Sequence, residues 1–108
     1  MDPEMSLVMV TFTVPTVDAG LALVRVLVEE RLIACGQVGA PITSVYEWDG
    51  ATQETVECPV ICKTTAAVAE RVLAAVHERH SYEVPEILVT PVVGSSPAYA
   101  AWVRQQTS

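Results

Sequence analysis

Side chains able to bind a metal ion lie close together in the second half of this sequence. His77 and His80 are three residues apart, and residues at that spacing face the same side of a helix. Imidazole nitrogens and cysteine thiolates suit copper and zinc, so His80 is the first metal candidate, with Cys35 or Glu86 as further ligands. The alternative is that both histidines lie in the last turn of a helix and interact with its carbonyl end.

A second group of chemically capable residues follows directly, in residues 82–86 (YEVPE). Glu83 and Glu86 are carboxylates three residues apart, near the expected start of a strand. They could coordinate a hard cation or carry out general acid–base chemistry. They could equally form ion pairs with Lys63 or an arginine across a subunit boundary.

Three cysteines, Cys35, Cys58 and Cys62, cannot all pair within one chain. Cys58 and Cys62 lie in an expected strand, where a rise of about 3.3 Å per residue puts their Cα atoms roughly 13 Å apart. That distance is about twice the reach of a disulfide. Even spacing places both on one face with Val56 and Val60, so we expect buried thiols in a reducing compartment. Cys35 could act as a nucleophile near a histidine, but a buried or interfacial thiol is favoured.

The elements that must position these residues begin with residues 7–14 (LVMVTFTV), whose apolar side chains on both faces indicate a doubly buried strand. Pro15 ends this strand, and Thr16 or Asp18 caps the helix that follows. Five residues form the apolar stripe expected on that helix: Leu21, Val24, Leu27, Val28 and Leu32.

A β-hairpin is predicted next, because residues 42–48 alternate in polarity and Asp49-Gly50 is a strong turn signal. Its second strand runs through residues 57–63, and Pro59 indicates a bulge or an edge position. Thr65 caps a second helix, and Ser96-Pro97 starts a third. The second helix has four expected apolar positions, Val68, Val72, Ala75 and Val76, and a strand is expected over residues 87–93.

The order β-α-β-β-α-β plus a C-terminal helix predicts an α+β, ferredoxin-like sandwich with an antiparallel sheet and both main helices on one face. We expect one domain over residues 1–108, with residues 1–5 as a flexible leader or a cloning remnant. The first strand is apolar on both faces, and little of the chain is left to cover the second face. Such an uncovered patch usually marks an interface, so we expect a homo-oligomer.

Composition excludes several function classes. The 108 residues carry 6 Lys plus Arg against 13 Asp plus Glu, a formal net charge of -7, which argues against nucleic-acid binding. The sequence has no basic cluster of the kind that binds a membrane surface, and no apolar run approaches the length of a membrane span. The N-terminus shows no secretory signal pattern, so a cytoplasmic location is expected.

Five motifs together resemble the CutA family of divalent-cation tolerance proteins. Residues 44–50 (SVYEWDG) are similar to the family's S-x-Y-x-W-x-G segment, and residues 29–35 (EERLIAC) to its EERLAAC helix end. Residues 63–65 (KTT) and 80–86 (HSYEVPE) resemble its KTT and HPYEVPE segments. Tyr99 with Trp102 matches its closing Y-x-x-W. The resemblance runs from about Val8 to the end of the chain.

The resemblance implies a homotrimer in which long hairpin strands pair across subunits, and an association with tolerance to copper and other divalent cations. It places Cys35 near a cleft between subunits, which we expect to hold Lys63, Tyr82, Glu83 and Glu86 as well. Four aromatic residues are assigned to trimer contacts: Tyr46, Trp48, Tyr99 and Trp102.

Copper coordination is associated in some members with the histidine that His80 matches. Arg79 and Phe12 stand where copper-associated members carry two further ligands. The family brings no catalytic mechanism with it, and no cofactor is expected to be required.

Three hypotheses follow. The first is a non-enzymatic homotrimer for divalent-cation tolerance that binds copper or a similar cation weakly through His80. The second is a small-molecule sensor or signalling trimer of the kind formed by nitrogen-regulatory PII proteins, with ligands between subunits. The third is an enzyme that uses Cys35, His80 and Glu86, which an open cleft around a low-pKa thiol would support.

Overall fold

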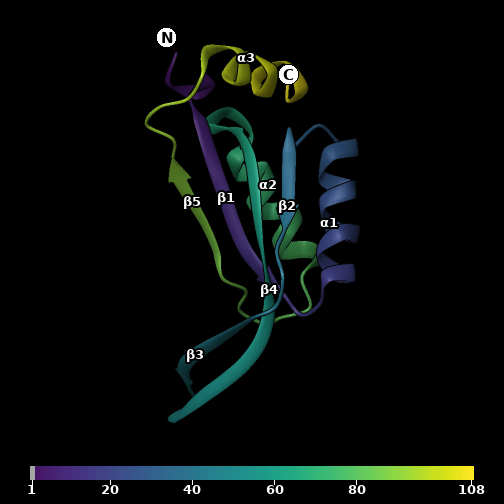
Figure 1. The fold of residues 1–108 in the computed structure, drawn as a ribbon, viewed down its shortest axis with the longest axis vertical. Helices are drawn as coiled ribbons and strands as arrows, with labels where there is room; N and C mark the ends of the chain where they lie inside the picture. The colour runs from purple at the N-terminus through teal and green to yellow at the C-terminus, as the bar shows by residue number, and fades with distance from the viewer. Residues whose placement is uncertain (1) are drawn as a thin grey trace.

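The computed structural model of the chain describes residues 2–108, which form an α+β fold with an antiparallel sheet and three α-helices (Figure 1). The sequence predicted a flexible leader over residues 1–5. Met1 lies outside the described residues, and Pro3–Met5 form a short 3-10 helix. The elements in chain order are η1 (Pro3–Met5), β1 (Leu7–Val14), α1 (Val17–Glu29), β2 (Cys35–Val38), β3 (Ile42–Trp48), β4 (Ala51–Thr65), α2 (Ala66–Arg79), β5 (Ile87–Pro91) and α3 (Pro97–Gln106).

The sheet has the strand order β2-β4-β1-β5, and every neighbouring pair is antiparallel. Figure 1 shows α1 and α2 beside and behind the sheet and α3 across one end. Alternate residues of β1 and β4 face α1 and α2, because successive strand residues point to opposite faces. The core on this face comprises Val10, Phe12, Val14, Leu23, Val24, Leu27, Leu32, Ile33, Cys58, Val60, Cys62, Val72 and Val76.

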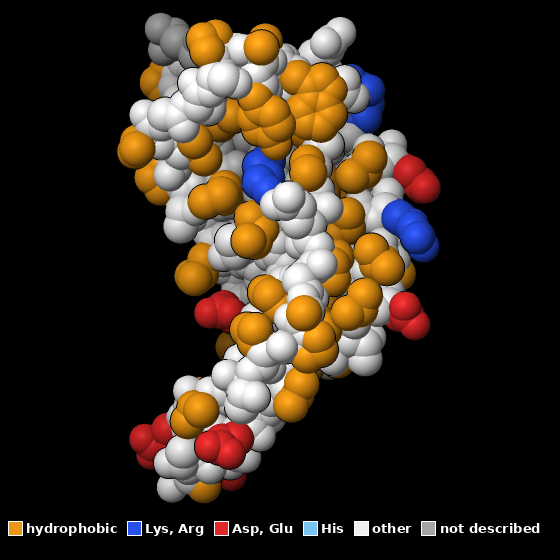
Figure 2. Space-filling view, in the orientation of Figure 1, with side chains coloured by type: hydrophobic (Ala, Val, Ile, Leu, Met, Phe, Trp, Pro, Cys, Tyr) orange, Lys and Arg blue, Asp and Glu red, His pale blue; other side chains and the backbone are white. Residues whose placement is uncertain are grey.

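Within residues 2–108, the opposite face of the sheet is covered only at one end. There α3 packs Ala100 and Val103 against Leu7 and Ala34. Further along, Thr11 lies opposite both Ile61 and Leu88 in the register, and Ile61 and Leu88 keep 37% and 53% of their surface exposed. Hydrophobic side chains are visible over this face in Figure 2.

The first helix buries a different stripe from the expected one. Thr16 caps α1 as predicted, since its side chain accepts a hydrogen bond from the Ala19 N–H. Val28, however, remains 43% exposed and Leu21 is only half-buried. The helix is rotated toward Gly20, whose small size allows the close approach of Val14 and Val38. The buried stripe is Gly20, Leu23, Val24 and Leu27.

The β3–β4 hairpin extends well beyond the body of the sheet (Figure 1). Asp49 and Gly50 both have positive φ at its tip, as the predicted two-residue turn requires. Burial along β4 changes phase between Glu57 and Cys58, where β4 leaves its pairing with β1. Val56 is therefore 64% exposed, and its expected place on the buried face with Val60 was wrong.

Pro59 lies in the interior of the sheet. Its register partner on β1 is Thr13, while β2 lies on the other side of β4, so β4 as a whole is not an edge strand, but β2 pairs with it only as far as Val60. Its carbonyl accepts from the Gly39 N–H, just past the end of β2. A residue's N–H and C=O point to the same side of an antiparallel strand, so the missing donor faces the place where β2 has ended.

Three other sequence expectations needed adjustment. Strand β2 was not foreseen, because its four residues CGQV are short and weakly apolar. The last strand ends at Pro91 rather than at residue 93. Thr65 stands at the N-cap of α2, but its side chain makes no capping hydrogen bond.

Gly36 on β2 offers a test of this packing. A Cβ at position 36 would lie 2.6 Å from Cγ1 of Val24 and 3.1 Å from Cδ1 of Ile33, whereas one at Gly94 would meet no atom within 4 Å. Gly36→Ala should lower the free energy of unfolding by about 1–3 kcal/mol through overpacking. Gly94→Ala, the control, should stay within about 1 kcal/mol of the original chain. Urea unfolding at one protein concentration measures both, and equal midpoints would contradict the close contact.

Candidate functional site

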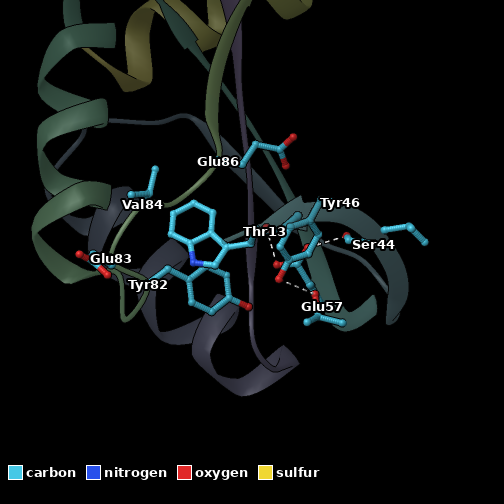
Figure 3. Close-up of a pocket in the computed structure, with 11 residues that line it drawn as sticks. Thr13, Ser44, Tyr46, Glu57, Tyr82, Glu83, Val84 and Glu86 are labelled. Atoms are coloured by element: carbon cyan, nitrogen blue, oxygen red, sulfur yellow. Dashed lines mark hydrogen bonds between the residues drawn. The ribbon is translucent and has the colours of Figure 1, made fainter. Parts of the chain in front are cut away.

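A groove opens where the β3–β4 hairpin leaves the sheet, between the hairpin and the loop that follows α2. Its volume is about 700 Å³, which lies within the usual range for small-ligand sites. Figure 3 shows side chains from β1, the hairpin and the loop converging on it. The lining residues are Thr13, Ser44, Val45, Tyr46, Trp48, Thr55, Glu57, Tyr82, Glu83, Val84 and Glu86.

One buried carboxylate, that of Glu57, joins the walls of this groove. Glu57 is 8% exposed. The Thr13 hydroxyl donates to its Oε1 at 3.0 Å, and the Ser44 hydroxyl donates to its Oε2 at 2.5 Å. The Tyr82 hydroxyl is directed toward the same carboxylate in Figure 3, and each of the two groups shifts the pKa of the other. The network therefore ties β1, both hairpin strands and the loop together.

This network shifts two ionisation equilibria in opposite directions. Burial alone would raise the pKa of Glu57, but the hydrogen bonds from Ser44 and Thr13, together with the nearby Tyr82 hydroxyl, outweigh burial and lower it. The pKa of Tyr82 is raised, first by burial and then by its bond to the Glu57 carboxylate and the charge of that group. Glu57 is thus held ionised and Tyr82 protonated.

His80 fastens the loop to β1. Its Nε2 lies 2.5 Å from the carbonyl oxygen of Thr13, and its Nδ1 accepts from the Tyr82 N–H at 3.1 Å. Because a carbonyl only accepts, the hydrogen-bond pattern assigns the proton to Nε2. The ring also packs 4.6 Å from that of Tyr82, centroid to centroid. A metal ion at Nδ1 would have to displace the Tyr82 N–H.

The expected pairing of His77 with His80 on one helix face was wrong. Helix α2 ends at Arg79, and His80 is its C-cap with extended backbone angles, φ -81° and ψ 142°. The i, i+3 relation holds only within a helix. His77 lies in the last helical turn, whereas the ring of His80 bonds to β1.

The predicted cleft residues fall into two groups within one chain. Tyr82, Glu83 and Glu86 line the groove, but Cys35 and Lys63 are register partners on β2 and β4, in line with Met9 of β1. Met9 precedes Thr13 by four strand residues, or about 13 Å. The Lys63 ammonium donates instead to the Gln37 side chain.

The thiols differ in accessibility. Cys58 and Cys62 are buried, as predicted, and Cys35 is half-buried. Burial raises the pKa of Cys62 to about 12, with a smaller contribution from Cys35 and an opposing one from Lys63.

Iodoacetamide should therefore modify Cys35 first, since only the thiolate reacts and the buried thiols are shielded. Mass spectrometry of the folded, reduced protein should show one adduct long before the second. Cys35→Ser should abolish that early adduct, and rapid modification of Cys62 would contradict the burial.

The groove's chemical capacity rests on its carboxylates and aromatic rings. Glu83 and Glu86 are exposed and Glu57 is buried. Among residues 2–108, no three His, Cys, Asp or Glu side chains are grouped so that they could hold a metal ion. His80, Cys35 and Glu86, the predicted metal ligands, are thus not gathered into one site of that kind within the described chain.

The four aromatic residues assigned to trimer contacts are all partly exposed. Tyr46 and Trp48 of β3 line the groove with 42% and 52% exposure. Tyr99 and Trp102 stack on α3 with ring centroids 5.7 Å apart. Burial raises the pKa of Tyr99, with a smaller contribution from Cys35. Ala34, the residue before Cys35, packs with Ala100 of α3.

The sequence interpretation missed Glu57, Thr13 and Ser44. A usable signal was present, because Glu57 stands between Val56 and Cys58 in a strand expected to be buried. A carboxylate in such a position needs hydrogen-bond donors from other elements. Those donors come from β1 and β3, 44 and 13 residues away, and no local pattern identifies them.

The arrangement defines a class: a small α+β subunit with an antiparallel sheet, a projecting hairpin and an acidic, aromatic groove at the hairpin's base. Residues 8–106 match the family described as CutA1 divalent ion tolerance protein. The chain belongs to this family, as its sequence motifs predicted. None of the helices in residues 2–108 is long and apolar enough to cross a membrane.

Relatives and solved structures agree with this assignment. The divalent-cation tolerance protein CutA of Thermus thermophilus is 35% identical over 98 residues, which cover 91% of this chain and 95% of that protein. The chloroplastic CutA of Arabidopsis thaliana is 37% identical over 100 residues, covering 93% of this chain but 55% of that protein. The chain thus spans about half the length of some relatives that it matches.

Two crystal structures illustrate the likeness in fold. CutA from Xylella fastidiosa superposes with a TM-score of 0.93 at 27% identity, covering 95% of this chain and 99% of that one. CutA1 from Oryza sativa gives 0.92 at 32% identity, covering 95% and 94%.

Proposed function

We propose that this protein contributes to divalent-cation tolerance, copper tolerance included, as a non-enzymatic homotrimer. Family membership supports the role, and the uncovered sheet face supports the assembly. The strand order β2-β4-β1-β5, with α1 and α2 packed on one face, also supports assigning the subunit to the ferredoxin-like class.

The observation that carries the assembly is the exposed apolar surface of the hairpin and the adjoining sheet. A two-stranded ribbon is marginally stable by itself, yet this hairpin exposes apolar side chains on both faces. They continue onto the sheet through Ile61 and Leu88. The hairpin residues concerned, which lie outside the groove, are Ile42 and Val56.

Weak binding of copper or a similar cation is the second part of the proposal. Imidazole, thiolate and carboxylate groups offer suitable ligands at His80, Cys35 and Glu86. A cation at Nδ1 of His80 competes with the Tyr82 N–H, which accounts for low affinity. Cys35 of β2 is level with Met9 of β1, about 13 Å along the strand from Thr13. A cysteine ligand for a cation at His80 would therefore have to come from a neighbouring subunit.

The test combines a mass measurement in solution with a calorimetric copper titration of the reduced protein. We expect a trimer mass and saturable binding that His80→Ala abolishes. His77→Ala is the matched control, since His77 is exposed on α2 and should leave the titration unchanged. A monomer mass would refute the assembly, and equal titrations of the two variants would refute the role of His80.

A further inference from the structure

The groove at the base of the hairpin has apolar and aromatic walls that a metal ion would not need. Trp48, Tyr46 and Tyr82 contribute aromatic rings, and Val45 and Val84 contribute aliphatic groups. Val45 and Val84 keep 62% and 67% of their surface exposed. Such walls favour a ligand with an apolar body.

The groove contains three carboxylates, of which one is already hydrogen-bonded within the protein and two are available to a ligand. Glu57 already accepts hydrogen bonds from Thr13 and Ser44, so it joins β1 to the hairpin and is not available to a ligand. Within residues 2–108, Arg79 forms an ion pair with Glu30. Neither Glu83 nor Glu86 has a cationic partner among these residues.

These two carboxylates lie apart. In Figure 3, Glu83 and Glu86 stand on different sides of Tyr82. A single Ca²⁺ or Mg²⁺ holds its oxygen ligands within about 2.6 Å, so it would engage only one of them. A ligand with two positive groups joined by an apolar chain could reach both.

We propose that this groove binds a linear polyamine, in which two or more ammonium groups are joined by methylene chains. Ammonium groups form charge-assisted hydrogen bonds with carboxylates such as Glu83 and Glu86. The methylene chain can lie along Trp48 and Tyr82, whose ring faces also attract the charged ends. The net charge of -7 favours the approach of a polycation.

This inference goes beyond the cation-tolerance proposal and needs no metal ion. Spermidine is the first probe, titrated by calorimetry at low ionic strength, and saturable binding with one ligand per subunit is expected. Trp48 lines the groove, so its fluorescence should change in parallel. Trp102→Phe serves as the background, because it removes the only other tryptophan.

The chain-length and charge requirements are tested with matched probes. A diamine such as 1,6-diaminohexane should bind at least about 5-fold more tightly than 1-aminohexane, because only the diamine pairs with both carboxylates. Glu83→Gln and Glu86→Gln should each weaken diamine binding about 5- to 10-fold. Glu54→Gln is the control, since Glu54 is exposed on the hairpin outside the groove.

Three results would overturn the inference. If Glu54→Gln weakened diamine binding as much as Glu86→Gln does, the attraction would be non-specific. The same conclusion would follow if Mg²⁺, at the same concentration of positive charge, displaced the bound diamine as well as another diamine does. A trimer whose Trp48 fluorescence ignores spermidine would show that a second copy fills the groove. Mass and copper titrations on the same samples separate these failures from failure of the cation-tolerance proposal.

Discussion

Glu57→Ala should lower the free energy of unfolding by about 3 kcal/mol at neutral pH, among the largest effects of any polar substitution in this chain. The carboxylate is 8% exposed and accepts hydrogen bonds from the hydroxyls of Thr13 and Ser44. Hydrogen bonds to a charged group contribute about 1.5–3 kcal/mol each, and a buried donor left without a partner costs about 1–3 kcal/mol.

The loss should not be uniform over the molecule. Ser44 and Glu57 are in the hairpin, Thr13 is in β1, and Tyr82 is in the loop after α2. Removing their common acceptor frees the loop and the base of the hairpin, while the core between the sheet and α1 stays packed. Amide hydrogen exchange should therefore rise first around Tyr82 and the hairpin base.

Chemical unfolding at a fixed protein concentration measures the effect, because assembly would make stability depend on concentration. Glu54→Ala is the control, since Glu54 lies on the same strand with its side chain exposed, and it should change stability by about 0.5 kcal/mol or less. Equal losses for the two variants would show that the buried network contributes nothing specific.

The same carboxylate makes stability depend on pH. The pKa of Glu57 is lower in the folded chain than its ordinary value of about 4.3. The unfolded chain therefore binds a proton first as pH falls. The network's contribution is complete above about pH 4.3 and is lost as pH falls through the lower native pKa. Glu57→Gln removes this contribution, so its stability deficit at pH 7 should shrink toward pH 3, as urea midpoints at each pH would show.

Local chemistry made much of the fold predictable. The doubly apolar segment 7–14 became β1 with the expected limits, since its pattern depends only on adjacent residues. Thr16 and Ser96 cap their helices through bonds to nearby N–H groups. The Asp49-Gly50 turn likewise follows from backbone preferences at two positions.

Features set by distant parts of the chain were not predictable in the same way. The phase of burial along β4 changes where β1 stops covering it, a tertiary event that no local pattern contains. The sequence predicted His80 to be a helix residue, but in the structure its ring bonds to the carbonyl of Thr13, which is 67 residues away. The metal candidates were chosen by residue type, which describes what a side chain can bind but not what already occupies it.

Leu88→Glu should dissociate the proposed homotrimer. Leu88 lies on β5 in register with Thr11, on the uncovered sheet face, and is 53% exposed in the single chain. The subunit should therefore tolerate the substitution. Burying an unpaired charge in an assembled interface costs several kcal/mol per ion. Since each 1.4 kcal/mol is a tenfold change in an equilibrium constant, subunit association should weaken at least about 100-fold.

Val28→Glu is the matched control for Leu88→Glu, because Val28 is an equally apolar residue, 43% exposed but on α1. Light scattering across a concentration series should give the trimer mass for this control and for the original chain. The Leu88→Glu protein should instead give a monomer mass with an unchanged circular-dichroism spectrum. A trimer that tolerates Glu at position 88 would move the contact away from this sheet face, and the hairpin would then have to provide the whole interface.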